Sequence, residues 1–222
     1  MLPTTTLKDI LVLYDGREGE ARAISGAISG AINPDDGGAA AAGSRSDYRS
    51  AATASLVDVS GIPVRDCCGC FGCWVRTPGL CILTGDEGNE LCHRTLEARA
   101  VVFISRITWG GYSGAIKTVA DRMLPLLHPD FRRVNGAMHH RMRYSRMPRL
   151  LTVGYGGRTA GEEETFLRYT AAHRTNFGAP DDRNGNSTRF TTIWRGDTGA
   201  LRRWFTAVIA EGRRDTTGEV PA

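Results

Sequence analysis

Residues 10–32 read ILVLYDGREGEARAISGAISGAI, which is an apolar run, a turn with two glycines and an amphipathic stretch in succession. The run at residues 10–14 is continuously apolar, which is typical of a strand covered on both faces of a parallel sheet. Small and aliphatic side chains then recur at intervals of three and four, so residues 20–32 are predicted to form a helix. A buried strand followed by an amphipathic helix predicts an α/β fold.

The same alternation extends along the rest of the chain. We predict further strands at residues 55–59, 100–105, 150–153 and 189–194, and further helices at residues 87–96, 162–177 and 201–209 and after an N-cap at Ser113. Five such strands predict an open, doubly wound parallel sheet. In sheets of this kind, ligands bind beyond the carboxyl ends of the strands.

Composition sets the broad class of the protein. Of the 222 residues, 41% are hydrophobic and 23% are charged, enough for one buried core. We expect a single domain over residues 1–222, with a flexible insertion at 33–54, a cysteine-rich loop at 61–86 and a basic loop at 128–149. The net charge of +4 is small and scattered, so nucleic acid is not the expected partner. The apolar runs are too short to cross a membrane and no secretion signal precedes them, so a cytoplasmic location is expected.

Five of the six cysteines lie between Cys67 and Cys81. Clustering of this kind indicates metal ligation or thiol chemistry and argues against a disulfide framework, which would be spread along the chain. Cys67, Cys70, Cys73 and Cys81 give the spacing C-x2-C-x2-C-x7-C, which suits a [4Fe–4S] cluster. Four-thiolate zinc, a redox pair and free thiols in an apolar loop remain the alternatives.

The loop after the first predicted strand is a candidate phosphate site. Two glycines before a helix can present backbone N–H groups to an anion, and Arg17 adds a positive charge. Three acids of the same loop, Asp15, Glu18 and Glu20, would repel that anion if they pointed inward. An ordinary strand-to-helix turn explains the loop equally well.

Two further strand ends carry glycine beside aromatic residues. The third strand is followed by Ser105, Arg106, Ile107, Thr108, Trp109 and Gly110, and the fourth by Gly154, Tyr155, Gly156 and Gly157. Glycine allows close backbone approach and an aromatic side chain supplies an apolar wall, which suits a planar heteroaromatic ligand. The alternative is that Trp109 and Tyr112 only cover the core.

Taken together, these motifs resemble the flavodoxin-like NADPH-dependent FMN reductases, and more narrowly the iron–sulfur flavoproteins among them. The resemblance covers about residues 7–210. It rests on CCGCFGCW at 67–74 with Thr77-Pro78-Gly79 and Cys81, on SRITWGGYSGAIKTVADRMLP at 105–125, on Asn135-Gly136 to His139-His140 with Arg143-Tyr144, and on VGYGG at 153–157 followed by Glu162 to Glu164 and Phe166.

The resemblance implies a flavodoxin-like sheet in the order 2-1-3-4-5, FMN as cofactor and NADPH as a co-substrate. It places the flavin ring on residues 105–110 and 154–157, the FMN phosphate on Asp15, Arg17, Gly19, Glu20 and Ala21, and a [4Fe–4S] cluster on the four spaced cysteines. The family's phosphate loop is usually Ser-Pro-Arg followed by small polar residues, and of these only Arg17 persists here. In place of the family's usual proline after Ser105, this chain has Arg106.

Two functions follow from these observations. The first is an FMN-dependent oxidoreductase or electron-transfer flavoprotein with a small-molecule or protein electron donor, assembled as a homodimer or homotetramer. Flavin chemistry needs little from side chains, so no catalytic residue is named. The second is a flavin-free module on the same scaffold, binding a metal or a protein, and the acidic phosphate loop is its direct support.

Overall fold

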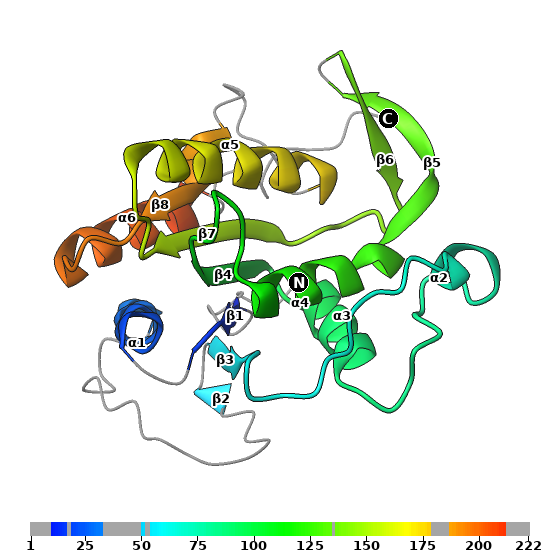
Figure 1. Ribbon diagram of the computed structural model, residues 1–222, viewed down its shortest axis with the longest axis horizontal. Coiled ribbons are helices and arrows are strands. Elements are labelled where there is room, and N and C mark those ends of the chain that lie inside the picture. Colours follow the sequence, from blue (N-terminus) through cyan, green and yellow to red (C-terminus); the bar gives the residue numbers. More distant parts are fainter. Residues whose placement is uncertain are drawn as a thin grey trace, which may run out of the picture.

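The computed structural model describes residues 10–16, 19–32, 50–51, 54–134, 136–178 and 187–211. Arg17 and most of the insertion predicted at 33–54 lie outside these described residues. Figure 1 shows a central sheet with helices on both sides and a separate hairpin at one end.

The central sheet has six strands in the order β2-β3-β1-β4-β7-β8. Five of them run parallel: β1 (Ile10–Tyr14), β3 (Ala54–Asp58), β4 (Ala100–Arg106), β7 (Arg149–Tyr155) and β8 (Thr191–Ile193). The short strand β2 (Ser50–Ala51) pairs antiparallel with β3 at the edge. Counted along the chain, the five parallel strands lie in the order 2-1-3-4-5, which confirms the predicted flavodoxin-like sheet.

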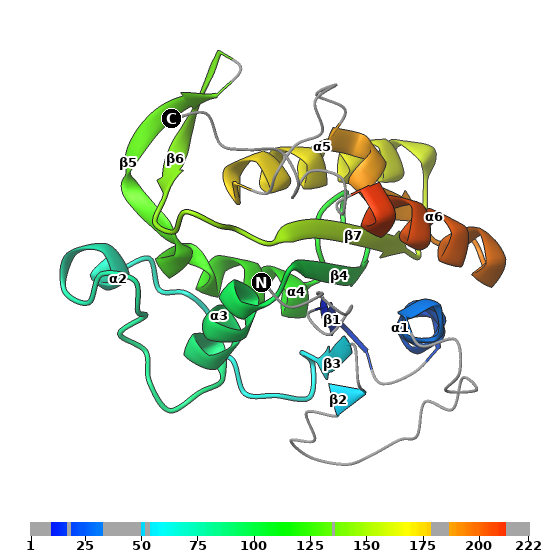
Figure 2. The same ribbon diagram turned by 180° about the vertical axis from the view of Figure 1, so that it is seen from behind.

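Two apolar layers cover the two faces of the sheet, as the doubly wound arrangement requires. One contains α1 (Glu20–Ile32) and α6 (Thr198–Glu211), whose buried side chains pack on Val12, Val102 and Val153. The other contains α3 (Gly88–Glu97), α4 (Gly114–Arg122) and α5 (Ala160–Asn176), which pack on Leu13 and Phe103. Figure 2, seen from behind, shows α1 and α6 side by side.

The helices that flank the ligand end begin at side-chain caps. Ser113 caps α4 as predicted, because its hydroxyl accepts a hydrogen bond from Ile116 N at 3.5 Å. Thr159 caps α5 in the same way through Glu162 N at 3.1 Å, so this helix begins earlier than the predicted residue 162. Glu162 and Glu163 in its first turn suit the positive end of the helix dipole.

The prediction of a basic loop at residues 128–149 is wrong for most of that segment. Strands β5 (Leu127–Val134) and β6 (Ala137–Met142) pair antiparallel in a two-stranded sheet of their own. The prediction failed because charged residues and Pro129 interrupt the alternation, and the pairing itself shifts register between Leu127 and Phe131. The chain turns at Gly136, whose φ of 83° favours glycine.

The hairpin is attached to the cysteine segment by aromatic side chains. Trp74 lies on the short helix α2 (Gly72–Val75) and donates from Nε1 to the Leu127 carbonyl at 3.1 Å. The ring of His140 lies between those of Trp74 and Phe131, with centroids 5.1 and 4.6 Å away. The hairpin and α2 therefore form one unit at the end of the molecule.

Two other observations complete the fold. The fifth strand, predicted at residues 189–194, is shorter than expected, because a 3-10 turn, η2 (Ser187–Phe190), precedes β8. None of the helices within the described residues combines the length and the apolar character that crossing a membrane would require.

Candidate functional site

The carboxyl ends of β1, β4 and β7 are joined by the carboxylate of Asp15. This side chain is only 6% exposed and accepts hydrogen bonds from Arg106 N, at 3.2 Å to each oxygen, and from the Tyr155 hydroxyl at 2.8 Å. Ile107 N also donates to the Tyr155 carbonyl at 2.8 Å. The predicted site residues Asp15, Arg106, Ile107 and Tyr155 are thus brought together at the switch point of the sheet.

Burial shifts the pKa values of Asp15 and Tyr155. Burial raises the pKa of the Asp15 carboxyl, although hydrogen bonds from Ser113 and Tyr155 partly offset that effect. Burial, and then the neighbouring carboxylate of Asp15, raise the pKa of the Tyr155 phenol. In their hydrogen bond the Tyr155 phenol is the donor and the Asp15 carboxyl oxygen is the acceptor.

Gly156 follows Tyr155 and lies beside the side chains of Arg106 and Glu20. Its φ is +67°, and a Cβ built on it would lie 3.6 Å from Arg106 Cγ and 3.9 Å from Glu20 Oε2. Glu20 is the exposed first residue of α1, and Gly19 before it has a φ of +70° with nothing within 4 Å of its Cβ position. Arg106 and Glu20 therefore lie beside Gly156 of the predicted flavin loops, and Glu163 lies beside Gly157.

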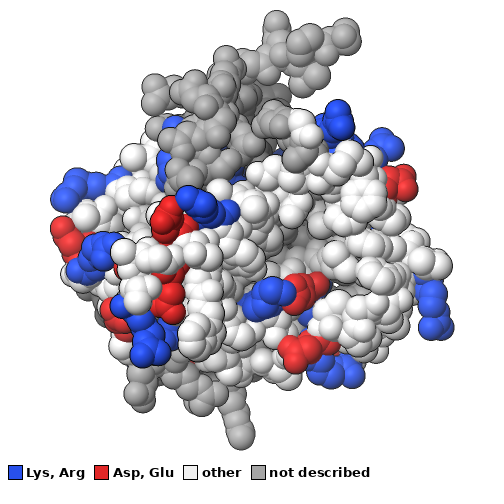
Figure 3. All heavy atoms as spheres, turned by 45° about the horizontal axis from the view of Figure 1, so that its top comes forward, with Lys and Arg blue, Asp and Glu red and all other residues white. Residues whose placement is uncertain are grey.

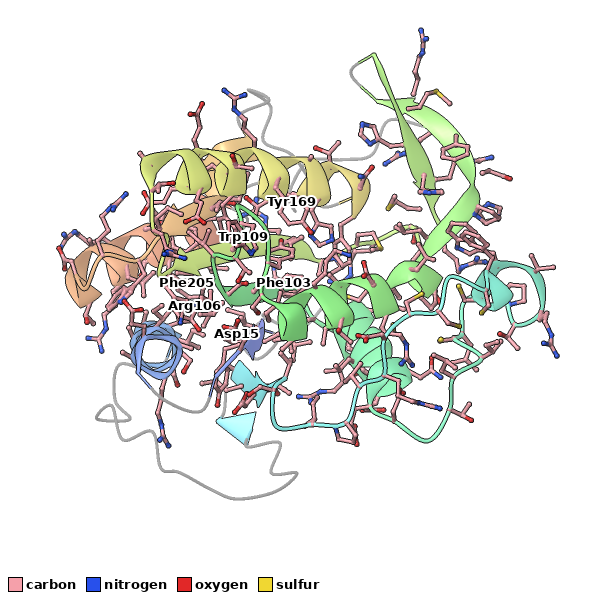
Figure 4. All side chains as sticks on the ribbon, viewed as in Figure 1. Asp15, Phe103, Arg106, Trp109, Tyr169 and Phe205 are labelled. Carbon is pink, nitrogen blue, oxygen red and sulfur yellow. The ribbon has the colours of Figure 1, made fainter. Side chains whose placement is uncertain are left out.

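The loop after β4 presents Trp109 to solvent. A tight turn holds it, because Thr108 and Gly111 exchange backbone hydrogen bonds of 3.0 and 2.9 Å. Trp109 has a φ of 53° and is 84% exposed, so an apolar side chain stands free on a strained backbone. Figure 4 shows Trp109 on this loop, with Asp15 and Arg106 side by side at the end of the sheet. Strain of this kind is common at functional sites.

The remaining glycines of the two loops serve packing. A Cβ on Gly154 would lie 2.6 Å from the Phe166 ring, one on Gly157 would lie 2.8 Å from Glu163 Cγ, and one on Gly110 would lie 2.6 Å from Thr165 Cγ2. Their absent side chains let α5 approach the strand ends. The sequence cannot distinguish these glycines from Gly156, because their neighbours come from a distant helix.

Ser105 positions the loop after β4. Its hydroxyl accepts a hydrogen bond from Ser113 N at 2.9 Å and donates to the Arg106 carbonyl at 2.9 Å. The predicted residue Ala21 is fully buried in the core and faces away from solvent. Sequence reasoning named Ser113 only as a helix cap and did not name the α5 residue Thr165, and both support this loop.

The described residues fit the two ends of FMN differently. At the ring end, Gly156 has no side chain and Trp109 presents a free face, as a planar aromatic ligand needs. Among the described residues of the phosphate end, Asp15 and Glu20 bring carboxylates near the start of α1, where phosphate groups need N–H donors and cations. The site therefore suits a flavin ring, whereas Arg17, the cation expected at the phosphate end, lies outside the described residues.

The cysteine segment lies away from this site. It leaves the end of β3 and reaches the far end of α4, where the Arg122 guanidinium donates to the Arg65 carbonyl at 2.8 Å. Figure 4 shows sulfur atoms near α2, on the side of the molecule opposite Arg106. The order of the strands does not reveal this position, because it depends on how the cysteine segment packs on the rest of the protein.

The four spaced cysteines differ in burial. Cys73 and Cys81 are buried, Cys67 is half-buried and Cys70 is exposed. Over the described part of the chain, which includes all six cysteines, no three His, Cys, Asp or Glu side chains are placed to hold a metal ion. Burial, and then the nearby thiols of Cys81, Cys67 and Cys70, raise the pKa of Cys73. A [4Fe–4S] cluster on these four residues stays a prediction.

A buried ion pair holds the cysteine segment on α4. Arg122 Nη1 lies 2.6 Å from Asp86 Oδ2 and Nη2 lies 2.9 Å from Oδ1, and both side chains are almost fully buried. The same guanidinium donates to the carbonyl of Arg65 at 2.8 Å. Arg122 holds the pKa of the Asp86 carboxyl well below its usual range.

A cavity of about 220 Å³ lies near the cysteine segment, lined by residues that include Cys67, Met123, His173 and Phe177. His173 Nδ1 lies 3.0 Å from the Tyr112 hydroxyl, and burial lowers its pKa to about 4. The imidazole is therefore neutral at physiological pH and belongs to an aromatic cluster with Tyr112 and Tyr169.

The sheet order and the position of the site define a flavodoxin-like protein. No protein-family model matches the chain, and a search of curated proteins finds no match. Among solved structures, the chain is similar to an NAD(P)H:quinone oxidoreductase from Methanothermobacter marburgensis, with a TM-score of 0.56 and 12% identity over 95% of this chain and 98% of that one. It is also similar to a flavodoxin, WrbA-like protein from Agrobacterium tumefaciens, with a TM-score of 0.51 and 13% identity over 93% and 98%.

A further similarity is to the rubredoxin oxygen:oxidoreductase of Desulfovibrio gigas, with a TM-score of 0.53 and 10% identity. This chain is matched over 94% of its length but spans only 37% of that protein. At these identities the likenesses show the flavodoxin-like fold.

Proposed function

We propose that the protein is a flavin-dependent oxidoreductase that uses NAD(P)H or a reduced protein as electron donor. The observation that carries the proposal is the 84% exposed Trp109, held at positive φ at the switch point that also contains Gly156, a residue without a side chain. Similar folds named as NAD(P)H:quinone oxidoreductase and flavone reductase support the same activity. The proposed donors are small molecules or proteins, and the proposed location is cytoplasmic.

The residues of the site position the ligand and tune its charge. A bound flavin would supply the acceptance and release of a hydride or electrons. The backbone of Gly156 allows the ring to approach the sheet, and Trp109 can cover one face of it. The Arg106 side chain, beside Gly156, places a positive charge where it would favour the reduced state of the ring.

Flavin binding and turnover test this proposal together. We expect the purified protein to quench flavin fluorescence and, with flavin bound, to oxidise NADH or NADPH in the presence of a quinone. Gly156→Val should weaken flavin binding at least about tenfold, because a side chain beside Arg106 and Glu20 would stand where the ring must approach the backbone. Gly85→Val is the matched control, since Gly85 has a similar φ of +79° and open surroundings in the cysteine segment.

We also propose a [4Fe–4S] cluster on Cys67, Cys70, Cys73 and Cys81. Its support is the spacing of these cysteines and the family resemblance. No step of the reaction is assigned to a cluster, because within the described residues no three His, Cys, Asp or Glu side chains are placed to hold a metal ion. Anaerobic reconstitution followed by iron and sulfide analysis tests it. Four irons per chain, lost in Cys73→Ser, would support a cluster, and less than about one iron per chain would remove it.

One observation favours the second function, a flavin-free module that binds a metal or a protein. The acidic side chains of Asp15 and Glu20 stand where the FMN phosphate would bind. A protein that binds neither FMN nor the isolated flavin ring would have this second function in place of the first.

A further inference from the structure

We propose that the cavity between α4, α5 and the cysteine segment is a second binding site, for a small uncharged phenol. This inference goes beyond the proposed flavin chemistry and does not depend on it. The cavity lies at the hairpin end of the molecule in Figure 1, whereas the predicted flavin loops lie at the carboxyl ends of the strands. All the residues that line it belong to the described part of the chain.

The size and the walls of the cavity suit one aromatic ring. Its volume is about 220 Å³, and its apolar lining includes Met123, Leu124 and Leu127, which follow α4, and Phe177, which follows α5. Apolar cavities of about 150 Å³ bind benzene, whereas pockets for larger ligands occupy about 300–1,000 Å³. The volume therefore admits a single substituted ring and excludes a flavin or a dinucleotide.

His173 supplies a polar group to this apolar cavity. Its Nδ1 is held by the Tyr112 hydroxyl at 3.0 Å, and Tyr112 belongs to the core and does not line the cavity. Within the described residues the imidazole makes no other hydrogen bond, and Nε2 is not among the side-chain atoms that are both sealed from solvent and unpaired. Nε2 therefore reaches the cavity, which is the accessible space that His173 lines.

The neutral imidazole selects a hydroxyl group as its partner. Burial lowers the pKa of His173 to about 4, so one ring nitrogen is a donor and the other an acceptor. Which of the two roles Nε2 has depends on the hydrogen bond to Tyr112. A phenol hydroxyl can donate or accept, so it can pair with Nε2 in either case.

The charged groups at the cavity favour an uncharged ligand. The residues that line it, all of them described, include the carboxylate of Asp121 and no Lys or Arg side chain. Lys117, the nearby cation, is already paired with Asp121 at 2.5 Å. An anion entering the cavity would therefore lose water without gaining a cation, which is unfavourable.

The cavity is accessible from the surface. Gly69, Asp121 and Asn176 line it and are exposed, so they mark its opening. The side chain of Asn176 is held in place, because its Oδ1 lies 2.7 Å from His139 Nδ1 on β6. A small ligand can therefore enter without separating the hairpin from α5.

Fluorine NMR titrations at pH 7 measure binding with three probes of similar size. We expect 4-fluorophenol to bind with a dissociation constant below about 1 mM. Fluorobenzene, which lacks the hydroxyl, should bind about three- to tenfold more weakly, the usual effect of one hydrogen bond. Binding of 4-fluorobenzoate should be weaker than that of both, because it is charged.

Two variants place the bound phenol in this cavity. Ala120→Leu fills the cavity from α4 and should weaken 4-fluorophenol binding at least about tenfold, and Ala172→Leu makes the same change at an exposed position of α5 as its control. His173→Phe keeps a ring and removes Nε2, so the affinities for 4-fluorophenol and fluorobenzene should become equal. His93→Phe is its control, because His93 is an exposed histidine of α3.

Gly156→Val separates this site from the flavin site and should leave 4-fluorophenol binding unchanged. Failure of 4-fluorophenol to bind the wild-type protein overturns the inference and leaves the proposed flavin function standing. Binding that is lost in Gly156→Val and kept in Ala120→Leu also overturns it, because the probe would then occupy the flavin site. An affinity ratio of phenol to fluorobenzene that is unchanged in His173→Phe overturns it as well, and this ratio decides if Ala120→Leu does not fold.

Discussion

At the scale of single residues, the Asp86–Arg122 pair is the strongest test of how the cysteine segment is held. We expect Asp86→Asn to lower the free energy of unfolding by about 3–5 kcal/mol, because it leaves a buried guanidinium uncompensated. Asp121→Asn, which removes an exposed partner of Lys117, should cost less than about 1 kcal/mol. Denaturant unfolding of both variants measures the difference.

The same pair gives a pH dependence with a defined sign. Arg122 lowers the pKa of Asp86 in the folded protein, so folding favours the ionised carboxylate. The stabilisation is complete above the ordinary pKa of an aspartate and is lost as the pH falls below it. The difference in free energy of unfolding between wild type and Asp86→Asn should therefore become smaller in acid. A difference that became larger in acid would contradict the lowered pKa of Asp86.

The cysteines differ in predicted reactivity according to their surroundings. A hydrogen bond from Gly72 N at 3.5 Å lowers the pKa of the exposed Cys70 thiol, whereas burial raises that of Cys92 to about 12. Because the thiolate is the nucleophile, iodoacetamide should modify Cys70 first and Cys92 last. Mass spectrometry of a labelling time course measures the order, and Cys70→Ser should remove the fastest step. Labelling of Cys92 as fast as Cys70 would disprove this account.

At the scale of elements, the hairpin depends on α2 for its attachment. Trp74→Ala removes the bond to the Leu127 carbonyl and the ring beside His140, so trypsin should cleave the hairpin faster, at Arg132, Arg133 or Arg141. Trp74→Phe keeps an aromatic ring and should have a smaller effect. Equal cleavage rates in wild type and Trp74→Ala would show that the hairpin is held by other contacts.

The elements that the sequence predicts well are those whose pattern is local. The helix at residues 20–32 has its predicted bounds, and the cap at Ser113 is confirmed, because spacing and capping depend on neighbouring residues. The β5–β6 hairpin was missed because its pairing shifts register and is supported from outside by Trp74. In the site, the roles of Gly154 and Gly157 depend on Phe166 and Glu163 of α5, which no local pattern indicates.

At the scale of the whole molecule, exposed apolar side chains gather on one end. Phe71 and Val75 at α2 are 51% and 79% exposed, and Phe131 and Met138 on the hairpin are 58% and 59% exposed. Elsewhere, the face shown in Figure 3 carries interspersed positive and negative side chains where it is described. Apolar clusters of this kind are typical of contact surfaces.

We predict that the protein forms a homodimer or a homotetramer. Light scattering at micromolar concentration should give two or four times the 24.1 kDa of the chain. Phe131→Arg should shift the distribution towards smaller species, because a charge in a buried contact is unfavourable. A wild-type protein that is monomeric at that concentration would refute the prediction.

The central claim is that the switch point of this flavodoxin-like sheet holds a flavin ring, and the visible spectrum tests it most directly. The purified protein would be mixed separately with excess riboflavin and FMN and then freed of unbound ligand by gel filtration. We predict that the protein recovered from at least one of the two mixtures shows the two visible-range bands of an oxidised flavin, and that these bands are weakened in Gly156→Val and retained in Gly85→Val. Protein that is recovered colourless from both mixtures would contradict the claim.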